Sequence, residues 1–213
     1  MLYHVIIKDL KATVLPMTIL TILLACLTPI LFSLKPLTIS QASLPGELFI
    51  PLIAIICIPT IFLPDQAASI QSIINSKHYR LSLLHSIRVV WFVSILSILD
   101  LIIIVLYESH QASFQVWPLL GDFLAKIFLL TGLILLCYHL SKSIVITYIL
   151  PITYFAFCLG YSGMGPLNLL SLIHGRPLSD SWIQLIIAIL LLFADLLLVF
   201  SQTRFIHHQA PLE

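Results

Sequence analysis

Four ionisable side chains interrupt long apolar stretches of the sequence: Asp100, Asp122, Lys126 and Asp195. Even permissive insertion scales give a charge at the centre of a membrane helix a cost of roughly 2.5–3.5 kcal/mol, so such residues usually face other helices and mark polar contacts or transport pathways. Asp122 and Lys126 stand four residues apart, a spacing at which two side chains meet on one helix face and can neutralise each other. These four residues are the predicted intramembrane polar and transport sites.

Asp195 is the most deeply embedded of the four, within the apolar run LLLFADLLLVF. We expect its carboxylate to face other helices. One interpretation is structural, because the carboxylate can anchor helix packing by bonding to a hydroxyl group or a cation. The other interpretations are functional, namely contact with a transported substrate or a proton-coupled role.

The sequence offers little other chemistry. The four cysteines lie in apolar segments without CxxC spacing, which favours packing as small hydrophobic residues. The eight histidines form no HExxH pattern, and the pair His207–His208 is typical of a solvated tail, so we expect no metal site. Phosphate-binding, nucleophile-elbow and dinucleotide-binding motifs are also absent from the sequence. We therefore expect no catalytic residues and no cofactor on this chain, which is predicted not to be an enzyme.

Composition places the chain in a lipid bilayer. Of its 213 residues, 60% are hydrophobic and 9% are charged, whereas a soluble domain carries about 25% charged residues. A chain of this length accommodates about six spans of roughly 20 residues and leaves no room for a separate soluble catalytic domain. The net charge of +1 and the lack of a clustered basic stripe give no indication of nucleic-acid binding.

The predicted fold is an all-α integral membrane protein, a single domain over residues 1–213. Strict period-two alternation is absent, so helices are expected rather than barrel strands. Two prolines, Pro51 and Pro59, interrupt the second span, which is therefore expected to be the shortest. The six expected spans are 14–34, 48–63, 89–106, 117–140, 144–161 and 182–201.

The distribution of cations predicts the orientation. With both termini in the cytoplasm, only Lys35 and Arg176 fall outside, as the positive-inside rule favours. The cytoplasmic segments then hold Lys8, Lys11, Lys77, Arg80, Arg88, Lys142 and Arg204. We expect residues 1–12 to form an amphipathic helix in the headgroup layer, with a frayed start of the first span as the alternative.

A polar break at residues 65–88 separates the second and third spans. Asp65 can cap a helix start, and its charge suits the positive end of the helix dipole. Ile70, Ile73 and Ile74 recur at helical spacing on one face, which predicts a short amphipathic cytoplasmic helix. The alternative is an interfacial elbow whose cations lie against anionic lipid headgroups.

Residues 162–180, between the fifth and sixth spans, are too apolar for an ordinary exposed loop. Gly163 and the pair Gly165–Pro166 break a helix, while the leucines that follow can enter the outer membrane face as short re-entrant helices. A folded surface loop is the alternative.

The arrangement resembles the permeases of ABC type-2 transporters. Members of that family have a short amphipathic amino terminus, six spans with both ends inside, and an acidic-start helix between spans two and three. The residues that occupy comparable places here are Asp65, Ala68–Ser69, Ile70, Ile73–Ile74, Asn75–Ser76 and Arg80. The sequence departs from the family pattern at Ala68, where glycine is usual, and in the turn, which contains no proline.

The resemblance implies that residues 65–80 form a coupling helix that docks on a separate ATP-hydrolysing subunit. The implied docking residues are Asp65, Ser69, Ile70, Ile73, Ile74, Lys77 and Arg80. It also implies two ATPase copies that carry ATP and magnesium, a second permease chain, identical or homologous, and a location in a bacterial plasma membrane.

The expected function is export of an amphipathic peptide, a lipid or a hydrophobic compound. The expectation about the substrate follows from the apolar character of the spans. The alternative is a partner-free multi-helix membrane protein, such as an immunity factor or an integral enzyme that acts on lipid.

Overall fold

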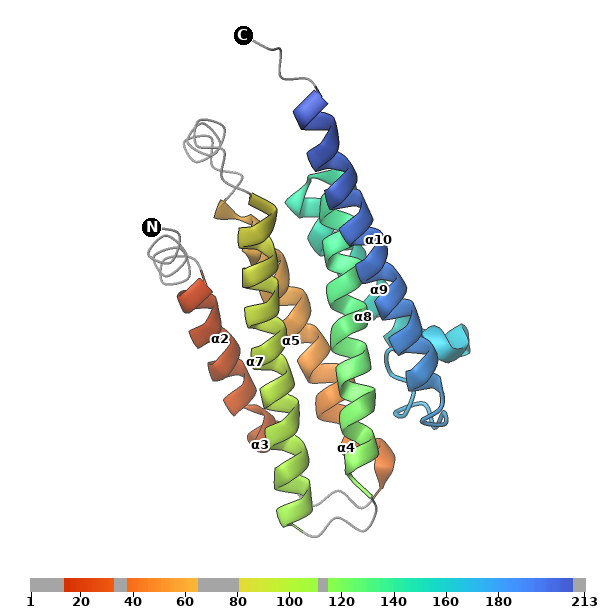
Figure 1. The fold of residues 1–213 in the computed structure, drawn as a ribbon. Helices are drawn as coiled ribbons and strands as arrows, with labels where there is room; N and C mark the ends of the chain where they lie inside the picture. The colour runs from red at the N-terminus through yellow and green to blue at the C-terminus, as the bar shows by residue number, and fades with distance from the viewer. Residues whose placement is uncertain (1–13, 33–37, 65–80, 111–114, 209–213) are drawn as a thin grey trace.

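The computed structural model describes residues 14–32, 38–64, 81–110 and 115–208, and every regular element in these ranges is helical (Figure 1). The first half contains α2 (Leu15–Cys26), α3 (Thr28–Leu31), α4 (Ile39–Leu44), the π-helical turn η2 (Pro45–Phe49), α5 (Ile50–Cys57) and the 3-10 helix η3 (Ile58–Phe62). The second half contains α7 (Leu81–Ser109), α8 (Trp117–Ser141), α9 (Ile144–Gly160), the 3-10 helix η5 (Ser162–Leu167) and α10 (Asp180–His208). The all-α prediction is confirmed for this part of the chain.

Several helices are long and apolar enough to cross a membrane, which supports the membrane assignment. In the described residues there are four such helices: Ile39–Phe62, Leu84–Ser109, Trp117–Ser141 and Asp180–Ser201. The apolar helices Leu15–Leu31 and Ile144–Gly160 are shorter. The prediction that the second span is the shortest is therefore wrong, because the first and fifth apolar helices are shorter than it.

The second span begins nine residues before the predicted start at Leu48, because the helical rod runs without a break from Ile39 to Phe62. The prolines do not end this rod. Pro51 lies in the first turn of α5, whereas Pro45 and Pro59 lie where the helix type changes, to π at Pro45–Phe49 and to 3-10 at Ile58–Phe62. Such local changes of hydrogen-bond pattern are a common way to continue a rod through a proline. Glu47, which the sequence placed outside the span, consequently lies inside it.

The end of the predicted polar break also differs in the structure. Residues from Leu81 onward belong to α7, and His85 and Arg88 are buried rather than aqueous. Arg88 donates from Nη1 to the carbonyl oxygen of Ile61 at 2.6 Å. A cation that donates to the carbonyl end of the preceding helix can be buried at low cost. This bond explains why Arg88 lies inside the bundle and not in an aqueous segment. The proposed helices at 1–12 and 65–80 lie outside the described residues.

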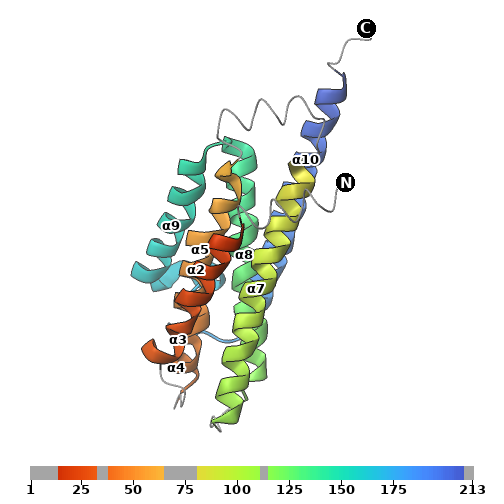
Figure 2. The same ribbon diagram turned by 90° about the vertical axis from the view of Figure 1, so that its left-hand side faces the viewer.

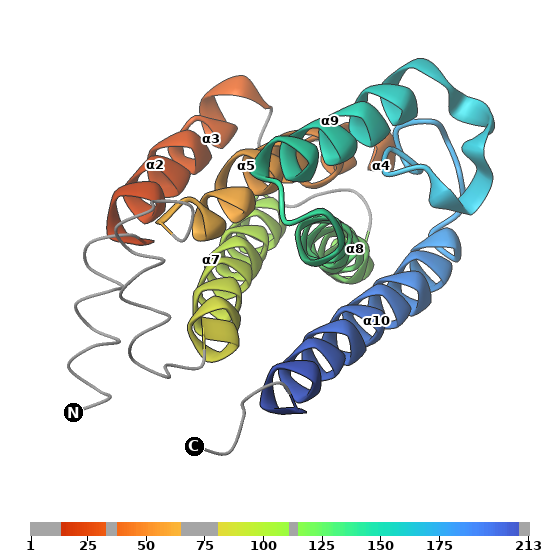
Figure 3. The ribbon, with the colours of Figure 1, turned by 90° about the horizontal axis from the view of Figure 1, so that it is seen from above.

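The rods form two layers, which Figures 2 and 3 show from the side and from above. One layer contains α2, α5 and α9, and the other contains α7, α8 and α10. The ends of the described segments that flank residues 65–80 lie at the upper end in Figure 1, together with the start of α2, the α8–α9 connection and the end of α10. The rods thus alternate in direction along the chain.

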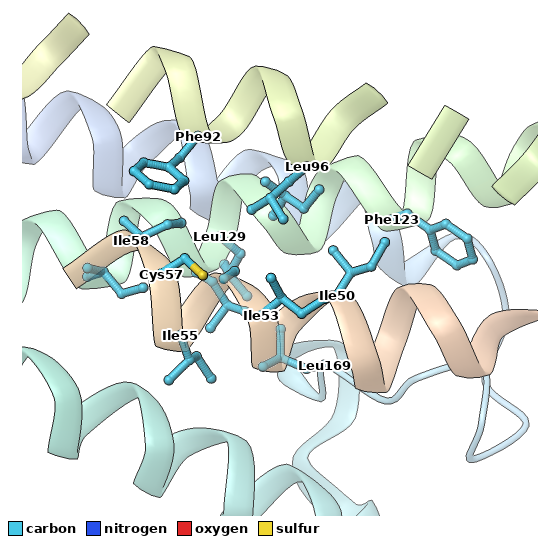
Figure 4. Packing of buried hydrophobic residues seen from close by; sticks show 14 of the residues in the cluster. Ile50, Ile53, Ile55, Cys57, Ile58, Phe92, Leu96, Phe123, Leu129 and Leu169 are labelled. Carbon is cyan, nitrogen blue, oxygen red and sulfur yellow. The ribbon is translucent and has the colours of Figure 1, made fainter. Parts of the chain in front are cut away.

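The core is formed around α8 and α5. The α8 helix packs against α5, α7, α9 and α10, and α5 also packs against α2, α7 and α9. Figure 4 shows Ile50 and Ile53 of α5 and Ile58 of η3 facing Phe92 and Leu96 of α7. Each of these five side chains is at most 1% exposed. The outer faces of α7, α9 and α10 carry exposed large apolar residues, as expected for surfaces in contact with lipid.

The contact between α8 and α10 supplies the first testable prediction. A Cβ atom at Gly132 would lie 2.9 Å from Leu191 Cβ and 3.4 Å from Ala188 O. We expect Gly132→Ala to lower the free energy of unfolding by roughly 1–3 kcal/mol, because overpacking forces two rods apart. The control is Gly121→Ala on the same helix, where a Cβ meets nothing within 4 Å. Equal stability of the two variants in denaturant unfolding would contradict this close packing.

Candidate functional site

The most unusual feature of the bundle is a buried charge network of Glu47, Asp122 and Lys126. Lys126 donates from Nζ to Glu47 Oε1 and to Asp122 Oδ2. All three side chains are fully buried. A buried ion pair is stable only when further hydrogen bonds satisfy its remaining polar atoms, and both carboxylates accept such bonds.

Glu47 receives three further hydrogen bonds from one short segment. The backbone amides of Leu172 and Ile173 donate to Oε1 and Oε2 at 2.9 Å and 2.8 Å. Ser171 donates from Oγ to Oε1 at 3.2 Å. Charge-assisted bonds of this kind are about twice as strong as neutral ones. Glu47 therefore ties the 168–173 segment to the second span.

Three elements place the network. Asp122 and Lys126 are four residues apart on α8, and Asp122 Oδ1 also accepts a hydrogen bond from Ser181 Oγ at 2.5 Å, at the start of α10. Glu47 lies in the π-helical turn Pro45–Phe49, directly beside Gly46. A Cβ at Gly46 would come within 2.1 Å of Phe123, so glycine permits the close approach of this turn to α8.

Residues 162–180 form the 3-10 helix η5 followed by turns, packed against the network. Leu169, Leu170 and Leu172 are at most 4% exposed. Gln184 of α10 donates from Nε2 to the carbonyl oxygens of Pro166 and Asn168 at 2.9 Å and 2.8 Å. Gln184 thus satisfies two backbone carbonyl groups of this segment, in which Leu169, Leu170 and Leu172 are buried against the bundle. Whether the segment enters the membrane or lies on its surface stays a prediction.

Asp100 of α7 lies in the same half of the bundle as the network. Its side chain is fully buried, and neither carboxyl oxygen has a hydrogen-bond partner among the described residues. Asp122 and Lys126 act on it electrostatically.

A second polar contact joins α8 and α10 at the opposite end of the bundle. Asp195 Oδ1 lies 2.6 Å from His139 Nδ1, and both side chains are buried. Close by, Phe62 stacks on Tyr138 with ring centroids 3.6 Å apart. Burial lowers the pKa of Lys142, just beyond α8, while the charge of Asp195 opposes that shift. Asp195 thus faces another helix, as expected from the sequence, and its partner there is His139. Its role in packing or in transport stays a prediction.

The structure thus gathers three of the four predicted intramembrane residues at one end and places Asp195 at the other. The pairing of Asp122 with Lys126 agrees with their spacing. Sequence reasoning missed Glu47 and His139. Glu47 follows Pro45–Gly46, which is typical of a boundary, and His139 stands near the end of an apolar rod among other uncharged residues. The proposed docking residues between Asp65 and Arg80 lie outside the described residues.

No family model, curated protein or solved structure matches the chain. Its function must therefore be inferred from the residues and their geometry.

The geometry of the network suits charge compensation among the second span, α8 and α10. Within the described ranges, His, Cys, Asp and Glu side chains form no group of three or more that could hold a metal ion. The network is closed, since Lys126, Glu47 and Asp122 bind each other and neighbouring donors. Such a network can hold helices together, and its members can exchange partners when the helices move.

Proposed function

We propose that the chain is the six-span permease subunit of an ATP-driven exporter in a bacterial plasma membrane, with both termini in the cytoplasm. Residues 65–80 dock on a separate ATPase, present in two copies beside a second permease chain, identical or homologous. The observation that carries the proposal is the alternation of the rods, which leaves the segments flanking 65–80 at the same end as the start of α2 and the end of α10 (Figure 1). An ATPase at this end could reach every connection there.

The parallel course of α8 and α10 supports six spans. Ser181 bonds to Asp122, and Asp195 bonds to His139, so the two rods run in the same direction with offsets of 59 and 56 residues. The chain must return between them, and α9 makes that return. With 17 residues and 1.5 Å per residue, α9 is about 25 Å long. The hydrocarbon core of a bilayer is about 30 Å thick, so α9 can span it when flanking residues and local thinning of the bilayer make up the difference.

Mechanical coupling needs helices that can move in response to a partner. A ligand shifts a conformational equilibrium only by binding the two states differently, which an ATP-driven partner at residues 65–80 would do. The apolar surfaces of the rods suit an amphipathic peptide, a lipid or a hydrophobic compound as the exported molecule.

Cysteine labelling across α9 tests the topology. In a cysteine-free background, we expect Ser162→Cys to react with a membrane-impermeant thiol reagent in intact cells and Ser143→Cys to be protected, because α9 alone separates the two positions. In inside-out vesicles the pattern should reverse. Labelling of both positions from the same side would contradict a spanning α9.

Transport by the reconstituted assembly tests the function. We expect Asp195→Leu to insert and assemble normally but to lower ATP-driven transport several-fold, because the polar contact between α8 and α10 is lost. The matched control is Asp195→Asn, which keeps an oxygen acceptor near His139 Nδ1 and should retain most of the transport rate. A wild-type rate in Asp195→Leu would mean that this contact takes no part in transport.

A further inference from the structure

Asp100 is the one carboxylate of the buried set for which the described residues provide no bond. It lies on the inner face of α7 with Phe92, Leu96 and Ile104, all of which are buried. Tyr107, two turns further along the same face, also has a buried hydroxyl without a hydrogen-bond partner in the described part of the chain. An unsatisfied buried polar group calls for an explanation in a native structure, and here two lie on one helix face.

The charged residues that act on Asp100 lie on α8. Asp122 and Lys126 of α8 act on it, and Glu47 binds Lys126 from the second span. Among the described elements, those that pack most closely on α7 besides α8 are η3, α5 and α2, whose residues include no aspartate, glutamate, lysine, arginine or histidine. Among the residues that the structure describes, Lys126 is therefore the cation that can compensate a charge on Asp100.

Lys126 is already committed to two carboxylates. Glu47 accepts three additional hydrogen bonds and Asp122 accepts one, so both have the donors that an ionised group needs. An ionised Asp100 would be a third negative charge near one positive charge, with no donor from the described residues. Burying an uncompensated charge costs several kcal/mol, whereas a neutral carboxyl without partners costs about 1–3 kcal/mol.

We propose that Asp100 is a proton-binding site that holds a proton in the arrangement described here. Deprotonation converts the carboxylic acid of Asp100 to a carboxylate, and the proton leaves to solvent. The new negative charge is compensated when Lys126 exchanges one of its present partners for Asp100. Proton release is thereby linked to opening of the Glu47–Lys126–Asp122 network. The inference concerns the bundle itself and does not rest on the proposed function.

Infrared difference spectroscopy on the intact chain in lipid nanodiscs tests the proposal. At neutral pH we expect the carbonyl stretch of a protonated aspartic acid in the wild type and its loss in Asp100→Asn. The control is Asp180→Asn, whose carboxylate pairs with Arg176 at a partly exposed site, and in which the band should persist. If Asp100→Asn fails to accumulate, Asp100→Glu in protein with ¹³C-labelled aspartate keeps a carboxyl group at this position, and its band should lack the isotope shift that the wild-type band shows. Absence of a protonated-aspartate band would overturn the proposal.

A second titration tests the link to the network. Asp122→Asn removes a negative charge near Asp100 and frees part of Lys126, so we expect the band to disappear at a lower pH than in the wild type. An unchanged or higher pH of disappearance would contradict the link. Sodium added at fixed pH should leave the band intact, and its loss on sodium addition would show a metal-cation site in place of a proton site.

Discussion

Replacement of Lys126 by methionine should cost the bundle roughly 3–5 kcal/mol of unfolding free energy, the typical loss when one partner of a buried ion pair is removed. Methionine nearly preserves the length of the side chain but leaves Glu47 and Asp122 without their shared cation. The segment held by Glu47 should loosen as well. Denaturant unfolding in detergent micelles, followed by tryptophan fluorescence, measures the loss.

The matched control for this variant is Arg176→Met. Arg176 also pairs with an aspartate four residues away, Asp180, at 2.5 Å, but its side chain is 33% exposed. Exposed pairs contribute about 0–1 kcal/mol because water and ions screen them. A loss in Lys126→Met no larger than that in Arg176→Met would show that the network does not hold the bundle together.

The double substitution Ile73→Asp and Ile74→Asp should abolish association with the ATPase while the spans remain inserted. Two charges would enter the apolar face that is proposed to dock, and the buried centre of an interface carries most of its binding energy. Copurification of the tagged chain with its ATPase, followed by quantification of both subunits, measures the effect. We expect the amount of bound ATPase to fall more than tenfold.

A matched control adds the same two charges to the opposite face of the proposed helix. At helical spacing, Ser72 and Asn75 would lie on the face opposite Ile70, Ile73 and Ile74. Ser72→Asp with Asn75→Asp should retain the ATPase. Equal loss in both double variants would mean that the segment is sensitive to charge in general, and normal binding by the isoleucine variant would refute the docking assignment.

The fold was predictable where composition and periodicity decide the structure. Apolar runs located each rod, and the spacing of Asp122 and Lys126 predicted their contact. The span boundaries were less predictable. Glu47, His85 and Arg88 are polar, so the sequence pattern placed them outside the spans, but in the structure they lie within the helices. Their burial depends on partners that are distant in sequence.

The contacts of the site could be predicted only in part for the same reason. That Asp195 needs a partner follows from its apolar surroundings, but the choice of His139 depends on the register of α8 against α10. Glu47 joins Lys126 across 79 residues and Leu172 across 125. A single sequence contains no measure of such distances, whereas an i,i+4 pair is set by helix geometry alone.

Purification of the intact, tagged chain from its native membrane, under gentle detergent conditions, tests the central claim most directly. We expect a soluble ATP-hydrolysing subunit to copurify in equal number with the permease chains and ATPase activity to accompany the complex. Purification of the chain alone, with no ATP-hydrolysing partner, would contradict the account and favour a membrane protein that acts without an ATPase.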